Sequence, residues 1–266
     1  MSNPTLKNPP LVLTLAQVKF NSVPTMDSYY KEIQNEFRKQ LAFIKHDIEE
    51  SASIRITQQG SDIKTSTLWT SATPNAKTRL ILGNDYLAIE TNEYPGFGKF
   101  IPNFYKALQI VQAITEVTHV TRIGFRYINR IETTPEKNLE YYLSSQLQGF
   151  KFESIEHDFS VSRTEALANT KQGRLRVHCV QFLSEKDASK SPLLPPDIGT
   201  QLFIRPVLTP AHCKYAYLDI DHFKQYENEP IRFELPAISK HLDLLHQGGY
   251  AAFMSGVTPK AIKEWQ

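Results

Sequence analysis

The chain has 266 residues, of which 41% are hydrophobic, 11% are aromatic and 22% are charged, a composition that excludes a disordered protein. Thirty Lys and Arg against 28 Asp and Glu leave a net charge of +2, which by charge alone indicates neither a nucleic-acid nor a membrane partner. The two cysteines, Cys179 and Cys213, exclude a disulfide framework and a four-cysteine zinc site. The polar N-terminus lacks the apolar core of a signal peptide, and no run approaches the roughly 18 apolar residues of a membrane span. We therefore expect a soluble cytoplasmic protein with no membrane partner.

The first part of the chain predicts a strand, a helix and an antiparallel meander. Residues 11–20 are rich in β-branched and apolar residues, which is typical of a buried strand. A helix is predicted over 27–46 by one apolar stripe, made of Tyr30, Ile33, Phe37, Leu41 and Ile44. Four short alternating runs follow at 53–58, 65–72, 78–83 and 86–91, with turns at Gln59-Gly60, Thr73-Pro74-Asn75 and Gly83-Asn84-Asp85.

The loop P-G-F-G-K-F-I-P then leads to a helix predicted at 101–117, with Pro102 in its first turn and an inward face of Phe104, Leu108, Val111 and Thr115. A strand at 122–132 comes next, followed by a short helix at about 136–147. Further strands are predicted at 153–164, 174–183, 201–208 and 214–223, with a loop at 184–200. A long helical segment begins near Leu235.

This order of elements predicts an α+β fold, in which antiparallel sheet carries long helices on one face. The turn-forming stretch at 132–138 divides the chain into an N-terminal α+β half, 1–134, and a C-terminal α+β half, 135–266. The segment Tyr86–Glu90 resembles Tyr217–Asp221. Each segment is at the end of a predicted meander and is followed by a loop and then a helix. The two halves are thus predicted to be related and to form a continuous or pseudo-duplicated sheet.

Residues 122–132, R-I-G-F-R-Y-I-N-R-I-E, carry an arginine at every fourth position. Alternate side chains of a strand point to opposite faces, which places Arg122, Arg126 and Arg130 on one face and a mostly apolar set on the other. We predict that the apolar face is core and that the amide of Asn129 finds a backbone hydrogen-bond partner there. The arginine face is interpreted as an anion- or partner-binding surface, as arginines paired with carboxylates of neighbouring strands, or as a solvated face.

Two aspartates, Asp219 and Asp221, share one face of the strand predicted at 214–223. Carboxylates with this spacing can hold Mg²⁺ together with a substrate phosphate, or they can meet the arginine strand across the sheet. We favour pairing with arginine, because the sequence places no third acidic ligand.

A second basic group combines Arg174, Arg176 and His178 of one predicted strand with Arg163 and Arg205 of neighbouring strands. It is either a positive binding patch or a solvated face.

Two other motifs do not match the pattern of a known binding site. G-F-G-K at 96–99 lacks the spacing and the hydroxyl of a phosphate loop, so we interpret it as a flexible helix entry. His241 and His246 are five residues apart on a helix and cannot chelate one zinc as an i, i+4 pair would. We expect structural roles for Asn129, Tyr127, Tyr217 and His246. No cofactor is predicted, and Mg²⁺ is considered only for the aspartate pair.

Three stretches carry a resemblance that spans the chain. They are R-I-G-F-R-Y-I-N-R-I at 122–131, Y-L-D-I-D-H-F at 217–223, and the terminal pattern of Leu245, His246, Phe253, Val257 and Thr258. With them, the chain resembles a sporadically distributed bacterial protein family of unknown function, which implies a common fold and no known catalytic residue. It departs from that family at Gly248-Gly249, where two interior glycines weaken a helix by roughly 2 kcal/mol relative to alanines and leave open whether the helix breaks.

The absence of a catalytic motif favours a non-enzymatic interaction or sensing module, whose partner is another protein or a second copy of the chain. The sporadic distribution of the family suggests a defence or toxin–antitoxin setting, an argument from analogy. One alternative is a Mg²⁺-dependent phosphate- or nucleotide-processing enzyme with an arginine-lined cleft. The other is a nucleic-acid-binding protein that uses the second basic group.

Overall fold

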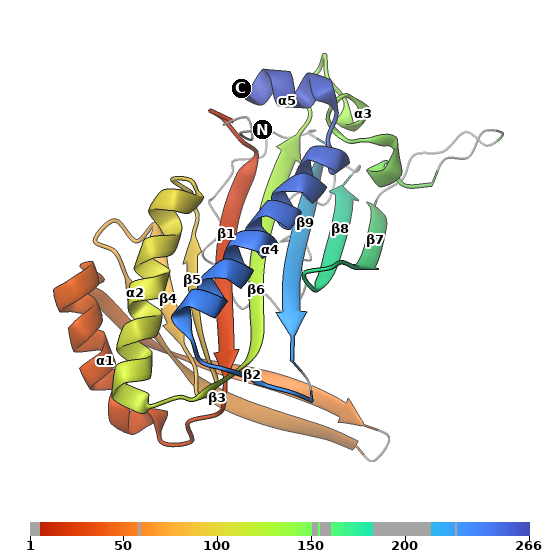
Figure 1. Cartoon of the computed structure of the whole chain (residues 1–266). Helices are drawn as coiled ribbons and strands as arrows, with labels where there is room; N and C mark the ends of the chain where they lie inside the picture. Colours follow the sequence, from red (N-terminus) through yellow and green to blue (C-terminus); the bar gives the residue numbers. More distant parts are fainter. Residues whose placement is uncertain (1–5, 58–59, 151–153, 155–160, 183–213, 227) are drawn as a thin grey trace. The chain divides into compact units, whose positions relative to one another are not determined.

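A computed structural model of the chain describes residues 6–57, 60–150, 154, 161–182, 214–226 and 228–266, with the backbone alone at 51–57 and 60–65 (Figure 1). The strands are β1 (Leu11–Phe20), β2 (Lys45–Thr57), β3 (Gly60–Ala72), β4 (Thr78–Leu82), β5 (Tyr86–Thr91), β6 (His119–Glu132), β7 (Val161–Asn169), β8 (Arg174–Phe182), β9 (Tyr215–Gln225) and β10 (Ile231–Arg232). The helices are α1 (Met26–Leu41), α2 (Phe97–Thr115), α3 (Leu139–Tyr142), α4 (Leu235–Gly256) and α5 (Pro259–Trp265), and a 3₁₀ turn spans Ser145–Leu147.

The described residues form an α+β fold, as predicted. Ten strands make one antiparallel sheet in the order β2-β3-β4-β5-β1-β6-β9-β8-β7, with β10 paired to β6, and the helices lie on one side of it. None of the helices in this part of the chain has the length and apolar character that a membrane crossing requires.

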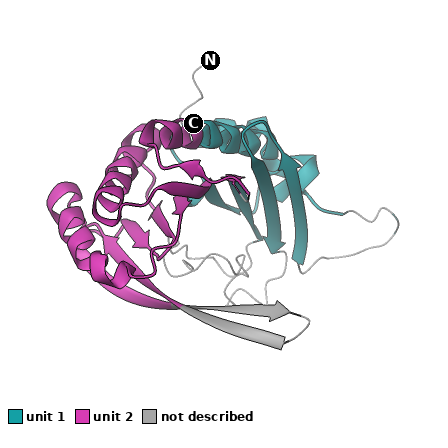
Figure 2. Ribbon diagram, turned by 60° about the horizontal axis from the view of Figure 1, so that its bottom comes forward, with its two compact units in different colours: residues 1–14, 125–223, 244–266 teal, residues 15–124, 224–243 magenta. Residues whose placement is uncertain are grey.

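The chain divides into two compact units built from interleaved segments (Figure 2). Unit 1 comprises residues 1–14, 125–223 and 244–266, and unit 2 comprises residues 15–124 and 224–243. The division of the chain near residue 134 and the relatedness of its two halves stay predictions.

In unit 2, strands β2 to β5 form the predicted meander, and helices α1 and α2 pack against each other. The turns at 73–75 and 83–85 are present, closed by hydrogen bonds from Ala76 N to Thr73 O (2.8 Å) and from Gly83 N to Tyr86 O (2.9 Å). The residue Gln59 of the third predicted turn lies outside the described residues.

The helix predicted at 27–46 ends earlier, at Leu41. Ala42 adopts a left-handed conformation with φ of 57°, and Ile44 N then donates to Ala72 O (2.9 Å), so the chain has already joined β3. Ile33 and Phe37 of the predicted stripe are buried, whereas Ile44 is 50% exposed. The predicted helix is too long because Ile44, which lies immediately before β2, falls by chance at helical spacing.

Helix α2 begins before the predicted position, at Phe97. Gly96, with φ of 92°, is its N-cap, and Lys99 N and Phe100 N both donate to Gly96 O. The G-F-G-K stretch is therefore the first turn of the helix rather than a flexible entry. Pro102 consequently lies inside the helix, while Phe104, Leu108 and Val111 are fully buried as predicted.

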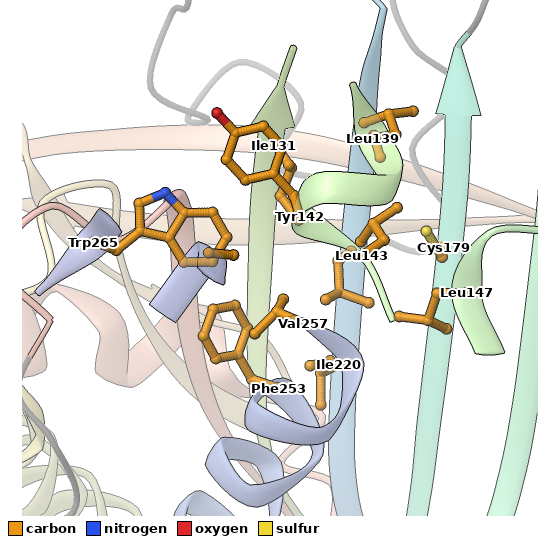
Figure 3. Packing of buried hydrophobic residues seen from close by; sticks show 13 residues of the cluster. Ile131, Leu139, Tyr142, Leu143, Leu147, Cys179, Ile220, Phe253, Val257 and Trp265 are labelled. Atoms are coloured by element: carbon orange, nitrogen blue, oxygen red, sulfur yellow. The ribbon is translucent and has the colours of Figure 1, made fainter. Parts of the chain in front are cut away.

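In unit 1, helices α3 and α5 and the second part of α4 contribute to one hydrophobic cluster with side chains of β6, β8 and β9 (Figure 3). Tyr142 stacks on Trp265 with ring centroids 5.8 Å apart and an interplanar angle of 9°. Thr258 caps α5 by accepting a hydrogen bond from Ala261 N (3.1 Å). The short helix predicted at 136–147 is α3 followed by the 3₁₀ turn.

The described residues include only some of the strands and loops predicted between residues 153 and 223. The strand predicted at 174–183 is β8, and the one at 214–223 is β9. The strand predicted at 153–164 is described only from Val161, where β7 begins. The loop at 184–200 and the strand at 201–208 lie outside the described residues.

Helix α4 continues without a break through Gly248-Gly249. A Cβ atom on Gly248 would lie 2.5 Å from Nδ1 of His222, and one on Gly249 would lie 3.4 Å from the Tyr127 ring. His222 is 1% exposed, and both of its ring nitrogens are in hydrogen-bond contact, with Leu245 O and with Oγ1 of Thr170. The glycine at 248 therefore serves close approach between α4 and β9, which outweighs its low helix propensity.

Candidate functional site

The face of β6 that the sequence predicts to be core is buried, and Arg126 and Ile128 of the other face are buried as well. Phe125, Tyr127, Asn129 and Ile131 all lie on the face predicted to be core, and each is buried. The amide of Asn129 donates to Leu218 O (3.2 Å) on the neighbouring strand β9. This is the kind of backbone partner that a buried amide requires.

The central contact of the candidate site joins Arg126 of β6 to Asp219 of β9. Nε of Arg126 donates to Oδ1 of Asp219 and Nη2 donates to Oδ2, each at 2.7 Å. Arg126 is 8% exposed and Asp219 is 2% exposed, so the pair is buried. A planar guanidinium that meets both carboxylate oxygens is the strongest geometry for such a pair. Both charges are thereby neutralised within the fold.

Strand β8 adds a second arginine to the same carboxylate. Nη2 of Arg176 lies 3.5 Å from Oδ2 of Asp219, and Arg176 stands directly opposite Asp221 in the β8–β9 register. The structure thus brings Arg126, Arg176, Asp219 and Asp221 together on one face of unit 1. Arginine and aspartate alternate there across neighbouring strands.

Arg130 lies in an aromatic environment on the same face. Its guanidinium carbon is 4.6 Å from the centroid of the Tyr215 ring, Nη1 donates to Oη of Tyr217 (3.3 Å), and Nη2 lies 2.9 Å from a carboxylate oxygen of Glu132. Burial raises the pKa of Tyr217, and the nearby Arg130 acts in the opposite direction. The guanidinium carbon is also 5.7 Å from the centroid of the Tyr217 ring, and since the two rings stand at 86° to each other, Arg130 makes a cation–π contact with each ring without lying flat against both.

The other arginines of the predicted sites are not gathered with this group. Arg122 belongs to unit 2, where its Nη1 donates to Oε1 of Gln17 (2.7 Å). Arg174 is exposed and stands opposite Phe223, and Arg163 is exposed on β7. Arg205 lies outside the described residues.

Two histidines of unit 1 hold α4 against the sheet. His246, predicted to be structural, is hydrogen-bonded through Nδ1 to the hydroxyl of Tyr127. His222, which sequence reasoning did not single out, places Nδ1 3.0 Å from Leu245 O and Nε2 3.0 Å from Oγ1 of Thr170. Burial lowers the pKa of His222 and favours its neutral form. Its place among Ala216, Leu218 and Ile220 on an apolar strand face was the only signal in the sequence.

A second buried ion pair lies in unit 2 and was also missed. Arg79 pairs through Nε with Glu90 and through Nη1 with Glu49 (2.9 Å). Glu90 is fully buried, and burial raises its pKa to about 7 although Arg79 opposes the shift. Its second oxygen, Oε2, has no hydrogen-bond partner. The i, i+11 separation of Arg79 and Glu90 reflects a cross-strand pair of β4 and β5 that the sequence alone does not reveal.

The geometry does not favour a metal at Asp219 and Asp221. Among the described residues, no three His, Cys, Asp or Glu side chains come together as a metal site would require. Both carboxylate oxygens of Asp219 already accept from Arg126. A cation at this carboxylate would have to displace a buried guanidinium.

Comparison with known proteins does not assign the chain to a family. No protein-family model matches the chain, and no curated protein matches it.

Proposed function

We propose that the chain is a non-catalytic interaction module that docks a protein strand on the edge of β7. The observation that carries this proposal is the exposure of β7. It pairs with β8 along one side, and it is the last strand of the sheet in the described part of the chain. Seven of its nine residues are exposed, including the apolar Val161 (43%) and Leu167 (61%).

An exposed strand edge presents a row of backbone donors and acceptors that another strand can pair with. Main-chain hydrogen bonds then supply affinity, and alternate side chains supply specificity. Val161, Arg163, Glu165 and Leu167 alternate with the other positions of β7 and share one face. This mixture of two apolar and two charged side chains suits recognition of a protein strand rather than a metal or a phosphate.

The enzyme alternative draws less support from the geometry. Mg²⁺-dependent phosphate chemistry needs a carboxylate that is available to the metal and arginines that are available to phosphate. Arg126 and Asp219 instead neutralise each other in a buried bidentate ion pair. Arg130 contacts Glu132, Tyr215 and Tyr217.

The nucleic-acid alternative also finds limited support. Each basic position in the middle of β8 has an acidic residue directly across from it. Arg176 stands opposite Asp221, and His178 stands between Asp219 on β9 and Glu165 on β7. Alternating charge of this kind offers no continuous positive track for a phosphate backbone.

A selection from random nine-residue peptides displayed on phage tests the proposal without assuming a partner. We expect enriched peptides that bind the native chain and lose binding to the double variant V161K/L167K, because the apolar positions of the docking face would then be charged. The matched control V161T/L167T leaves both positions uncharged, with residues that favour strands, and should retain part of the binding. Enriched peptides that bind V161K/L167K equally well would overturn the docking surface.

Thermal unfolding with MgCl₂ and ATP, or with MgCl₂ and tripolyphosphate, tests the enzyme alternative. We expect no magnesium-dependent stabilisation. A clear stabilisation that is lost in Asp221→Asn would contradict the proposal and favour the phosphate enzyme. For the nucleic-acid alternative, fluorescence anisotropy of labelled DNA and RNA at low salt should show no salt-sensitive binding.

The resemblance to a sporadically distributed bacterial family extends the proposal to a defence or toxin–antitoxin setting. Expression in a bacterial host challenged with a phage panel tests this setting. We expect a changed plating efficiency or a growth defect that V161K/L167K removes. If neither appears, the setting is withdrawn.

A further inference from the structure

We propose that the strand docked on β7 is β7 of a second copy of this chain, paired antiparallel about a two-fold axis at Thr164. This inference names the partner of the docking surface proposed above and therefore rests on that function. It follows from the order of side chains along the strand.

The sequence of β7 is complementary to itself about Thr164. In an antiparallel pair centred there, Arg163 stands opposite Glu165 of the second copy, and Val161 stands opposite Leu167 of the second copy. Each of these contacts occurs twice because of the two-fold symmetry. One face of the joined strands would thus carry two ion pairs flanked by two apolar pairs.

The four side chains lie where such pairing needs them. In the β7–β8 register, Val161, Arg163, Glu165 and Leu167 face Phe182, Val180, His178 and Arg176 in turn, so they share one face of the sheet. A two-fold axis perpendicular to the sheet continues this same face into the second copy. All four side chains are exposed, which leaves them accessible to a second copy.

Other pairings fit less well. Moving the axis to Glu165 places Arg163 opposite Leu167 and Val161 opposite Asn169, which loses both the ion pairs and the apolar pairs. At the other end of the sheet, β2 begins Lys45-His46-Asp47-Ile48-Glu49-Glu50, and a two-fold axis at Ile48 places Asp47 opposite Glu49. Like charges directly opposite each other destabilise a strand pair. An axis at His46 would place Lys45 opposite Asp47, but these charges and the apolar Ile48 lie on opposite faces of β2, whereas on β7 the ion pairs and the apolar pairs share one exposed face.

A strand pair alone makes a small interface, so the dimer should be weak and dependent on concentration. Sedimentation velocity over a series that reaches the order of 1 mM therefore suits the measurement. We expect the native chain to shift from the 30.4 kDa monomer toward twice that mass as its concentration rises.

Charge exchange on β7 gives the sharpest test. R163E places two glutamates opposite each other at both symmetry-related contacts, and E165R does the same with arginines. Each variant alone should dimerise about tenfold more weakly than the native chain. An equimolar mixture of the two should recover association as a mixed dimer, since Glu at 163 then faces Arg at 165. R163E/E165R should restore the self-pair.

Matched controls make the same charge changes elsewhere. Arg232→Glu and Glu229→Arg alter exposed residues of unit 2 and should leave association unchanged. Circular dichroism confirms that every variant is folded. Equal association of R163E, E165R and the native chain would overturn the proposal, as would a mixture that associates no better than its components. Growth into species larger than a dimer would indicate head-to-tail pairing and would also overturn it.

Crosslinking measures the register independently. Cys179 stands directly opposite Thr164 in the β7–β8 register and is therefore replaced together with Cys213. In a C179A/C213S background, Thr164→Cys places the two introduced thiols opposite each other at the axis, whereas Ala168→Cys places them roughly 26 Å apart along the strands. We expect disulfide-linked dimer for position 164 and little for position 168, and the reverse result would contradict the register. If the peptide selection identifies the β7 edge but these experiments show no dimer, the docking function stands and the second copy is excluded as its occupant.

Discussion

Arg126 and Asp219 meet across β6 and β9 in a two-point ion pair, with both nitrogen–oxygen distances at 2.7 Å and both side chains buried. The two residues are 93 positions apart in the chain. A pair with this geometry neutralises the two charges that a phosphate enzyme would need, and it ties neighbouring strands of unit 1 together. Its role is therefore structural, and its energetic consequences can be measured.

Asp219→Asn should destabilise the fold by about 3–5 kcal/mol, because a buried guanidinium is left without its counter-charge. The double variant R126M/D219L removes both charges and should lose less stability than Asp219→Asn. Urea unfolding followed by circular dichroism compares the two. A double variant less stable than Asp219→Asn would show that the pair contributes more than mutual charge compensation.

Asn129→Leu should also lower the melting temperature, since it removes the hydrogen bond to Leu218 O and leaves a buried carbonyl unsatisfied. The expected cost is about 1–3 kcal/mol. Asn103→Leu, on the exposed side of α2, is the matched control and should have little effect. An unchanged melting temperature for Asn129→Leu would count against a structural role for this amide.

Gly248→Ala and Gly249→Ala make the same change at neighbouring positions of α4. Alanine raises helix propensity by about 1 kcal/mol at either position. At 248 the added methyl group overlaps the buried ring of His222, so a net loss of about 1–3 kcal/mol is expected. At 249 the nearest atom is 3.4 Å away, and stability should be unchanged or slightly higher. Equal effects in thermal unfolding would contradict close packing of α4 on His222.

The pH dependence of stability should report on Glu90. Burial raises its pKa from 4.5 to about 7, so between these values the folded chain holds a proton that the unfolded chain releases. The stabilisation is full below about pH 4.5 and is lost as the pH rises through about 7. Relative to Glu90→Gln, the native chain should therefore lose on the order of 3 kcal/mol between pH 5 and pH 8.

His222 has the opposite sign, because burial lowers its pKa and the stability it contributes is lost as the pH falls below about 6.5. It is common to both chains and cancels in the comparison with Glu90→Gln. A difference between the two chains that does not vary with pH would show that Glu90 does not bind a proton near neutrality.

The α+β class and most strands could be predicted from the sequence, because the run of apolar and β-branched residues at 11–20 and the alternation at 122–132 are local signals. The ends of the helices were less predictable. Ile44 fits the helical stripe by spacing, yet the left-handed Ala42 ends the helix before it. The sequence does not predict the left-handed conformation of Ala42, since alanine rarely adopts it.

The candidate site shows where local reasoning stops. Alternation favoured pairing of the two aspartates with the arginine strand, but which arginine meets which aspartate depends on the register of β6 and β9, which is a property of the whole sheet. The glycine at 248 could only be read as a weak helix former until the position of His222 was known. Glu90 gave no local signal, because its burial and its partner Arg79 arise from the β4–β5 register.

Hydrogen–deuterium exchange of β7 tests the central claim most directly. If the module docks a second copy on this edge, backbone amides within Val161–Asn169 should exchange more slowly as the protein concentration rises, and R163E should remove that protection. Exchange in α2, in unit 2, should stay constant over the same series. Protection of β7 that does not depend on concentration, or concentration-dependent protection confined to other elements, would contradict the account.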